Sequence, residues 1–326
     1  MNKPTWKCGP RLARLVEYCR EAWKGNRRDL ARTLILALPV LYGFFVVARF
    51  GVNVPAGDEA NSMWFVDLFM RDGACARTFG ELWEPHNEHR MLLPKLVFLG
   101  LAWLAHYDIK AAMFLSMTAA AGVYFVCLRH LWKATAPEPG RMLLGVAVGF
   151  CVFNVVQVEN MLWGFQVAWF MLLFFAVAAF HWFAKWAEGG RRRDMMLCLL
   201  CGLASGLSSF HGLLVLPTIL GAMVLRGRQG GRIPWKPMLA TAGVLACFSA
   251  VYLQGWRKAA QHPDLFGNTP ENIVTFFLCL FGAPFQIMFP FQYARIFIYQ
   301  QIVSGSQGIV MCIGALVFLG SLAATA

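Results

Sequence analysis

Apolar runs long enough to cross a bilayer dominate this chain and leave few alternatives to a bundle of membrane-spanning helices. A transmembrane helix needs roughly 17 to 25 mostly apolar residues, because the bilayer core offers no water to satisfy a backbone that is not helical. The mean hydropathy of +0.54 is too apolar for a soluble domain. We therefore predict an all-α polytopic membrane protein with about nine transmembrane helices. The predicted spans lie near residues 33–51, 111–128, 142–158, 162–184, 195–210, 212–225, 237–255, 273–290 and 308–325.

The net charge of +12 comes from basic residues that are concentrated in short segments between the apolar runs. Lys and Arg of membrane proteins gather in cytoplasmic loops, so the excess indicates topology and argues against nucleic-acid binding. The first 32 residues hold nine Lys and Arg and show no cleavable signal peptide. This predicts a basic cytoplasmic tail (1–32) ahead of a single transmembrane domain (33–326). Because the chain stops at the end of an apolar run, the number of C-terminal spans stays open.

One further apolar segment, 91–107, is short and carries charge near its start, so it needs a second argument. We take the N-terminus to be cytoplasmic. If 91–107 does not cross the membrane, every later basic loop lies in the cytoplasm; if it crosses, all of these loops lie outside. We therefore predict that 91–107 is a surface helix within a first external loop that covers 52–110. A second amphipathic surface helix is predicted in this loop from NSMWFVDLFMRDG, where Trp64 and Phe65 lie on an apolar stripe. The basic loops are those with Arg129, Lys133 and Arg141, with Lys185 and Arg191 to Arg193, and with Arg226, Arg228, Arg232 and Lys236.

Two adjacent carboxylates, Asp58 and Glu59, follow a few residues after the first span reaches the external face. Pro55 and Gly57 keep the backbone irregular there, so the pair is predicted to lie near the membrane interface. A carboxylate in such a partly desolvated place can have a raised pKa and act as a general base. The alternative is structural, namely an N-cap for the helix that starts near Asn61.

The stretch EPHNEHRMLLPK concentrates charge in the same loop. His86 and His89, with Glu88, have a spacing that metal ligands can use, although HxxH on an irregular loop is weak evidence for a metal site. Arg90 and Lys95 suit a phosphate group at the membrane surface, Arg through its fork of N–H donors and Lys as a point charge. The alternative is a solvated surface loop without a binding role.

The next two external turns add polar residues on the same side of the membrane. VQVENMLWGFQ holds Glu159, Asn160 and Gln166, and SSFHGLLVLP holds His211. A lone carboxylate in an apolar hairpin is a functional candidate because its burial is costly, whereas ordinary turn solvation and a structural histidine are the alternatives. Four polar groups converge on the external face, and we therefore predict that the functional site lies there.

The order of these features resembles the GT-C superfamily of polyprenyl-phosphate-sugar-dependent glycosyltransferases, which includes protein O-mannosyltransferases and the aminoarabinose transferases of lipid A. GDEANS looks like the family's DE motif, which implies Asp58 as catalytic base and Glu59 as its support. EPHNEHRMLLPK takes the place of the His/Pro-rich stretch that contacts donor and phosphate, with HNEHR instead of the usual H-P-P. Glu159 and His211 lie where relatives carry an acidic and a basic residue. The resemblance covers residues 33–225.

This resemblance implies a multi-pass protein of the cell inner (plasma) membrane, with its first external loop in the periplasm. It would move a sugar from a polyprenyl-phosphate-linked donor to a glycan, lipid or protein acceptor, with inversion. No metal is required when cations meet the leaving phosphate, although Asp58, Glu59, Glu159 and the histidines could hold a divalent cation. The residues expected to bind substrate are His86, Glu88, His89, Arg90, Lys95, Glu159, Asn160, Gln166 and His211.

Two other classes of function compete with this interpretation. A transporter or flippase for a lipid-linked or small anionic substrate would need ionisable residues at the mid-depth of its spans. A non-catalytic assembly partner of an envelope enzyme is the third class, and its sequence would need none of these features.

Overall fold

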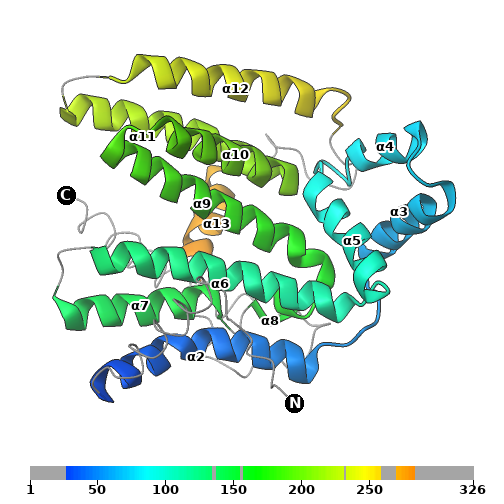
Figure 1. The fold of residues 1–326 in the computed structure, drawn as a ribbon, viewed down its shortest axis with the longest axis horizontal. Coiled ribbons are helices and arrows are strands. Elements are labelled where there is room, and N and C mark those ends of the chain that lie inside the picture. The colour runs from blue at the N-terminus through cyan, green and yellow to red at the C-terminus, as the bar shows by residue number, and fades with distance from the viewer. Residues whose placement is uncertain (1–26, 134–136, 155–156, 231–232, 258–268, 283–326) are drawn as a thin grey trace, which may run out of the picture.

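The computed structural model describes residues 27–133, 137–154, 157–230, 233–257 and 269–282, and every regular element in these ranges is a helix. Long helices run side by side, and three short helices, α3, α4 and α5, project from one end of them (Figure 1). The long helices are α2 (Arg27–Phe50), α6 (Ile109–Lys133), α7 (Glu138–Val152), α9 (Val167–Gly189), α10 (Arg192–Ser208), α11 (Val215–Gly230) and α12 (Trp235–Leu253), with α13 (Pro270–Gly282) beside them. The short ones are α3 (Glu59–Asp72), α4 (Ala76–Trp83), α5 (Leu92–Ala105), α8 (Val158–Met161), η2 (Gly164–Gln166) and η3 (Phe210–Leu214).

Five helices of the described chain are long and apolar enough to cross a membrane, which makes this a multi-pass membrane protein. They cover Asp29–Phe50, Ile109–Lys133, Gly164–Gly189, Phe210–Arg228 and Trp235–Leu253. The predicted spans 142–158 and 195–210 correspond to α7 and α10, which are shorter, with 15 and 17 residues. The run 273–290 is described only to residue 282, and 308–325 lies outside the described residues. The count of nine spans therefore stays a prediction.

Small residues let the long helices approach closely, as is common between helices in membranes. A Cβ atom on Gly149 of α7 would lie 2.7 Å from Cγ of Pro39 in α2. A Cβ on Gly122 of α6 would lie 2.6 Å from Cε2 of Phe174 in α9. Around these contacts Val47 and Met117 are fully buried. Close backbone packing thus supplies the interhelical contact that the hydrophobic effect does not supply within lipid.

Basic residues gather at the end of the bundle opposite to α3, α4 and α5. Arg32 of α2 pairs with Glu138 at 2.5 Å, and Lys133 of α6 with Glu188 at 3.8 Å. Arg226 of α11 donates a hydrogen bond to the backbone carbonyl of Ala187. These contacts join the ends of helices from each of the predicted basic loops, so the positive charge lies on one side of the bundle.

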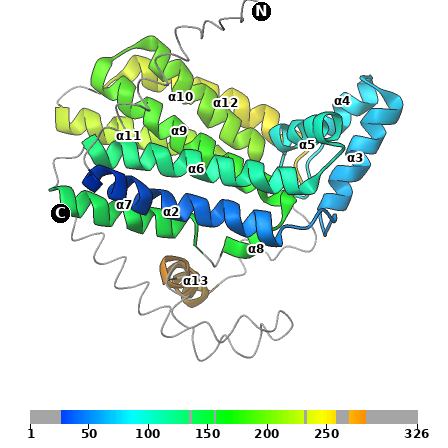
Figure 2. The ribbon, with the colours of Figure 1, turned by 60° about the horizontal axis from the view of Figure 1, so that its bottom comes forward.

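Residues 52–108 leave the bundle and return to it at the same end (Figure 2). The N–H of Ile109 donates to Oδ1 of Asn53 at 2.8 Å, and Nζ of Lys110 donates to the carbonyl of Ala48 at 2.8 Å. These bonds connect the first turn of α6 to the end of α2. The segment between them, including α5, therefore does not run along the bundle, and we refer to α3, α4, α5 and the turn 84–91 as the platform.

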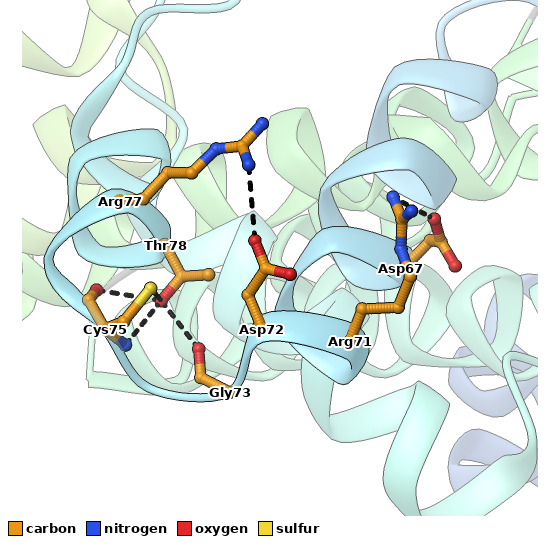
Figure 3. Close-up of polar contacts among 7 residues, drawn as sticks. All are labelled: Asp67, Arg71, Asp72, Gly73, Cys75, Arg77 and Thr78. Atoms are coloured by element: carbon orange, nitrogen blue, oxygen red, sulfur yellow. Dashed lines mark hydrogen bonds and ion pairs between the residues drawn. The ribbon is translucent and has the colours of Figure 1, made fainter.

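The junction between α3 and α4 shows how local chemistry shapes the platform (Figure 3). Gly73 has φ +64°, which ends α3, and its N–H donates to the carbonyl of Phe69 at 3.0 Å. The Thr78 hydroxyl accepts from the N–H of Cys75 at 3.0 Å and donates to the carbonyl of Gly73 at 2.8 Å, which caps α4. The two nearby ion pairs, Asp67 with Arg71 and Asp72 with Arg77, are exposed and contribute little to stability.

Topology can be tested with reporter domains inserted into the full chain after Asn87, after His106 and after Gly140. Since α5 does not run along the bundle, we expect the same compartment at Asn87 and His106 and the opposite one at Gly140. The measurement is paired alkaline phosphatase and fluorescent-protein activity. Opposite readouts at Asn87 and His106 would show that α5 crosses the membrane.

Candidate functional site

Glu59 is a buried carboxylate that joins two distant segments of the chain. Glu59 is 1% exposed. Oε2 accepts the N–H of Ala56 at 2.7 Å, and Oε1 accepts the N–H of Phe165 at 2.9 Å. The second bond caps the start of η2, where N–H groups lack partners within the helix. A Cβ on Gly164 would lie 2.7 Å from Oε1, so a glycine there leaves room for the carboxylate.

Burial and hydrogen bonding act in opposite directions on Glu59. Burial raises the pKa of its carboxyl above the usual value, while the N–H groups of Ala56, Phe165 and Gly164 stabilise the ionised form and oppose that rise. Both oxygens serve as hydrogen-bond acceptors, which leaves this carboxylate little freedom to move. Its place in the structure indicates an anchor for the loop, and the catalytic support that the resemblance implied stays a prediction.

Asp58 stands next to this anchor but faces a different environment. Its side chain is 45% exposed, and Oδ2 lies 3.6 Å from Nε2 of His86. Asp58 occupies the N-cap position of α3 without making a side-chain capping bond. Trp163 holds the preceding loop, because Nε1 donates to the carbonyl of Ala56 at 3.0 Å and the ring packs under Gly57, which has φ +56°. The accessible carboxylate of the pair is therefore Asp58.

The HxxH segment forms a tight turn. The N–H of His86 donates to the carbonyl of His89 at 2.8 Å, the N–H of His89 donates back at 3.0 Å, and Asn87 between them has φ 52°. The His86 ring lies 5.1 Å from that of Phe165. Among the described residues no group of three or more His, Cys, Asp and Glu side chains is placed to hold a metal ion. The turn thus positions its two imidazoles for separate contacts.

His89 belongs to a cluster of rings with His211. Its Nδ1 accepts the N–H of Phe210 at 3.4 Å, and its ring centroid lies 5.7 Å from that of His211. The Trp169 ring lies 4.9 Å from His211, which is exposed. Since Nδ1 of His89 acts as acceptor, the neutral ring carries its proton on Nε2 and is a donor there.

Arg90 holds the platform to the end of α12. The residue is 3% exposed. Its guanidinium donates to the carbonyls of Trp83 and Tyr252, each at 2.6 Å, and to the carbonyl of Gln254. Its backbone N–H donates to the Tyr252 hydroxyl at 2.8 Å. The guanidinium that the sequence assigned to phosphate binding is thus engaged with backbone carbonyls, and the predicted phosphate contact stays a prediction.

Lys95 is engaged in the same way within the platform. Nζ donates to the carbonyl of Glu84 at 2.7 Å and to the carbonyl of Glu81, and it lies 5.5 Å from the Phe65 ring centroid. Burial lowers the pKa of this amine to about 8, while the nearby Glu81 and Glu84 charges oppose the shift. The cation therefore stabilises the end of α4 rather than extending into solvent.

The remaining predicted residues make local contacts or are placed only by their exposure. Glu88 accepts a bond at its backbone carbonyl from Nε1 of Trp256 at 3.1 Å. Glu159 is exposed on α8, and Asn160 donates to Oε1 of Gln157 at 2.6 Å. Gln166 is 9% exposed and follows Phe165 in η2. The structure thus brings together Asp58 with His86 and His89 with His211.

A cleft of about 310 Å³ opens in the platform beside His86 and is the main concave feature of the site. Sequence analysis missed most of its lining, because aromatic and polar residues of an amphipathic helix give no local signal of facing a cavity. Trp64 and Phe65 were recognised only as an apolar stripe. The cleft is lined by Asn61, Ser62, Trp64, Phe65, Glu81, Glu84, Pro85, His86, Asn87, Met91, Lys95, Phe98 and Phe165.

Comparisons with protein-family models, curated proteins and solved structures found no match to this chain. A function therefore has to be argued from the residues of the site, since a helical membrane fold by itself specifies no activity.

Replacing Arg90 tests the role of its bonds to the backbone. In Arg90→Met, the carbonyls of Trp83, Tyr252 and Gln254 lose their donor, and the buried Tyr252 carbonyl left unsatisfied costs about 1–3 kcal/mol. We expect the apparent unfolding temperature in detergent to fall by about 5 °C or more. Arg71→Met is the matched control, because the Arg71 pair with Asp67 is exposed and should shift the temperature by about 1 °C or less. Equal shifts in the two variants would contradict this role.

The lowered pKa of Lys95 predicts that the stability of the protein changes with pH in the alkaline range. Its pKa is about 8 in the folded protein against a reference value of 10.5. Between these values the unfolded chain binds more protons than the folded one, so the Lys95 contribution to stability rises with pH in this window. Thermal scans should show wild type gaining about 1–2 °C relative to Lys95→Met between pH 8 and pH 10. Lys110→Met is the control, because it also removes a lysine that donates to a backbone carbonyl. A difference in unfolding temperature between wild type and Lys95→Met that stays constant from pH 8 to pH 10 would refute the prediction.

Proposed function

We propose that this protein is an integral-membrane glycosyltransferase that moves a sugar from a polyprenyl-phosphate donor to a hydroxyl of an envelope glycan, lipid or protein. The observation that carries the proposal is that two adjacent carboxylates differ in burial and in their contacts. Glu59 is buried and anchors the loop through two N–H groups, whereas Asp58 is accessible and lies 3.6 Å from His86 at the edge of a cleft. A positioned, accessible carboxylate beside a cleft is what a general base requires.

The proposed reaction needs few groups from the protein. The acceptor oxygen attacks the anomeric carbon, Asp58 takes the hydroxyl proton, and the bond from that carbon to the phosphate oxygen breaks with its electron pair leaving on the phosphate. Attack from the face opposite the phosphate inverts the configuration. His86 Nε2 lies 3.6 Å from Asp58 Oδ2, so the imidazole stands beside the base without forming a hydrogen bond to it.

Charge that develops on the leaving phosphate needs donors, and the histidine pair is better placed for this than the two predicted cations. Arg90 and Lys95 are held by backbone carbonyls. His89 and His211 lie together, His211 is exposed, and the bond from Phe210 to Nδ1 of His89 directs its proton to Nε2. We therefore assign the phosphate contact to these imidazoles.

The transporter alternative has one observation in its favour, a pair of histidines inside the bundle. Nε2 of His130 in α6 lies 2.9 Å from Nδ1 of His181 in α9. Both residues lie in the half of their helix nearer the basic end, and the central turns of the five candidate spans contain no Asp, Glu, Lys or Arg. A transport path for an anion would place charge at that depth, so the transferase is the better supported proposal.

The test compares cells that carry wild type, Asp58→Asn or Asp67→Asn at matched expression. Loss of a general base slows transfer by roughly 10²–10⁴-fold, so Asp58→Asn should accumulate one lipid-linked sugar and deplete it from an envelope glycan. Asp67→Asn, at an exposed ion pair of the same helix, should behave as wild type. Mass spectrometry of the polyprenyl-phosphate-sugar pool and of the envelope glycans measures the accumulation and the loss. Unchanged pools and glycans in Asp58→Asn would refute the proposal.

A further inference from the structure

The cleft in the platform has an apolar aromatic floor. Phe65 and Phe98 are each 3% exposed, and the Phe98 ring stacks on that of Phe165 with 6.3 Å between centroids. Trp64 stands at the same cleft and is 50% exposed. The exposed ring of Trp64 can pack against the C–H face of a saturated ring, while the buried Phe65 and Phe98 form the apolar base beneath it. Trp64 therefore suits the cleft to a compact cyclic ligand.

The polar lining of the cleft consists mainly of hydroxyl, amide and carboxylate groups, with the amine of Lys95 and the imidazole of His86 beside them. Asn61, Ser62 and Asn87 offer donors and acceptors for hydroxyl groups, and Glu81 and Glu84 offer acceptors only. Among the residues that line the cleft, Lys95 is the one Lys or Arg, so two carboxylates stand against one ammonium.

The ammonium of Lys95 is also poorly available to an anion in the cleft. It already donates to the carbonyls of Glu81 and Glu84. Burial lowers the pKa of Lys95 to about 8, which weakens its charge further in mildly alkaline solution. A phosphate in this cleft would meet net negative charge and would lose the water that solvates it, which is unfavourable.

We propose that the cleft binds the acceptor, presented as a neutral ring rich in hydroxyl groups, and that the donor phosphate lies outside it. This inference rests on the proposed function. A volume of 310 Å³ is at the lower end of the roughly 300–1,000 Å³ range of small-molecule pockets, so one or two sugar rings would fill it. His86 lines the cleft and lies next to Asp58, which brings an acceptor hydroxyl to the base. His89, in the same turn, contacts His211 instead.

The test measures binding to the full-length protein in lipid nanodiscs by saturation-transfer NMR. The probes are methyl glycosides of common hexoses, pentoses and N-acetylhexosamines, and the matching sugar 1-phosphates. We expect at least one neutral glycoside to bind and its 1-phosphate to bind several-fold more weakly. Tighter binding of the 1-phosphates, or no binding of any glycoside, would overturn the proposal.

Two variants locate the binding in the cleft. Trp64→Ala should weaken the glycoside about tenfold through lost ring contact, whereas Trp103→Ala should leave it unchanged, because Trp103 is 78% exposed near the end of α5 and does not line the cleft. Glu84→Gln should raise the affinity of the 1-phosphate, and it retains the backbone carbonyl that holds Lys95. Equal effects of Trp64→Ala and Trp103→Ala would overturn the assignment of binding to the cleft.

Asp58→Asn separates this inference from the proposed function. Asn keeps a side-chain oxygen that can accept a hydrogen bond from the acceptor hydroxyl, so the variant should still bind the glycoside, within a few-fold of wild-type affinity. Glycoside binding together with an unchanged lipid-linked sugar pool in Asp58→Asn would refute the transferase and leave a sugar-binding cleft. A changed pool without any glycoside binding would support the transferase and refute the acceptor cleft.

Discussion

The carboxylate of Glu59 is the constraint on which the platform end of this protein depends. Removing a carboxylate from water costs several kcal/mol unless hydrogen bonds compensate it, and here the N–H groups of Ala56 and Phe165 do so. Because these donors belong to the loop after α2 and to the start of η2, the bonds hold the segment between α2 and α3 against the start of the α9 region. Arg90 adds a second attachment, to the end of α12, through backbone carbonyls. The platform is thus fixed to the bundle at two places that are far apart in the sequence.

This arrangement separates structural from chemical roles among groups of similar type. Of the two carboxylates, the buried one anchors and the accessible one, Asp58, faces His86. Of the cations, Arg90 and Lys95 stabilise backbone carbonyls, while the imidazoles of His89 and His211 lie together. Loop residues held by a rigid scaffold are where catalytic and binding groups are usually found. The basic residues at the opposite end of the bundle contribute to topology and not to this site.

Helices could be predicted from the sequence because they depend on a local property, the length of apolar runs. The run 91–107 is an example, since a short helix was predicted there and α5 covers Leu92–Ala105; its place at the membrane surface and the topology of the chain stay predictions. The partners of Arg90 could not be predicted, because backbone carbonyls have no sequence signature and Tyr252 lies 162 residues away. Backbone N–H groups likewise have no sequence signature, so the sequence could not show that Glu59 is the buried carboxylate and Asp58 the accessible one. The nine-span count depended on runs that the structure describes as shorter helices or only in part.

Hydrogen–deuterium exchange of the full-length protein in nanodiscs tests the central claim, that Glu59 couples the loop after α2 to the start of η2. In wild type, peptides that cover 54–60 and 163–167 should exchange slowly, because the N–H groups of Ala56 and Phe165 are bonded to one carboxylate. Glu59→Ala should accelerate both peptides together and leave α11 unchanged, and Asp58→Asn should accelerate neither. Faster exchange at 54–60 alone, with 163–167 unchanged in Glu59→Ala, would contradict the account.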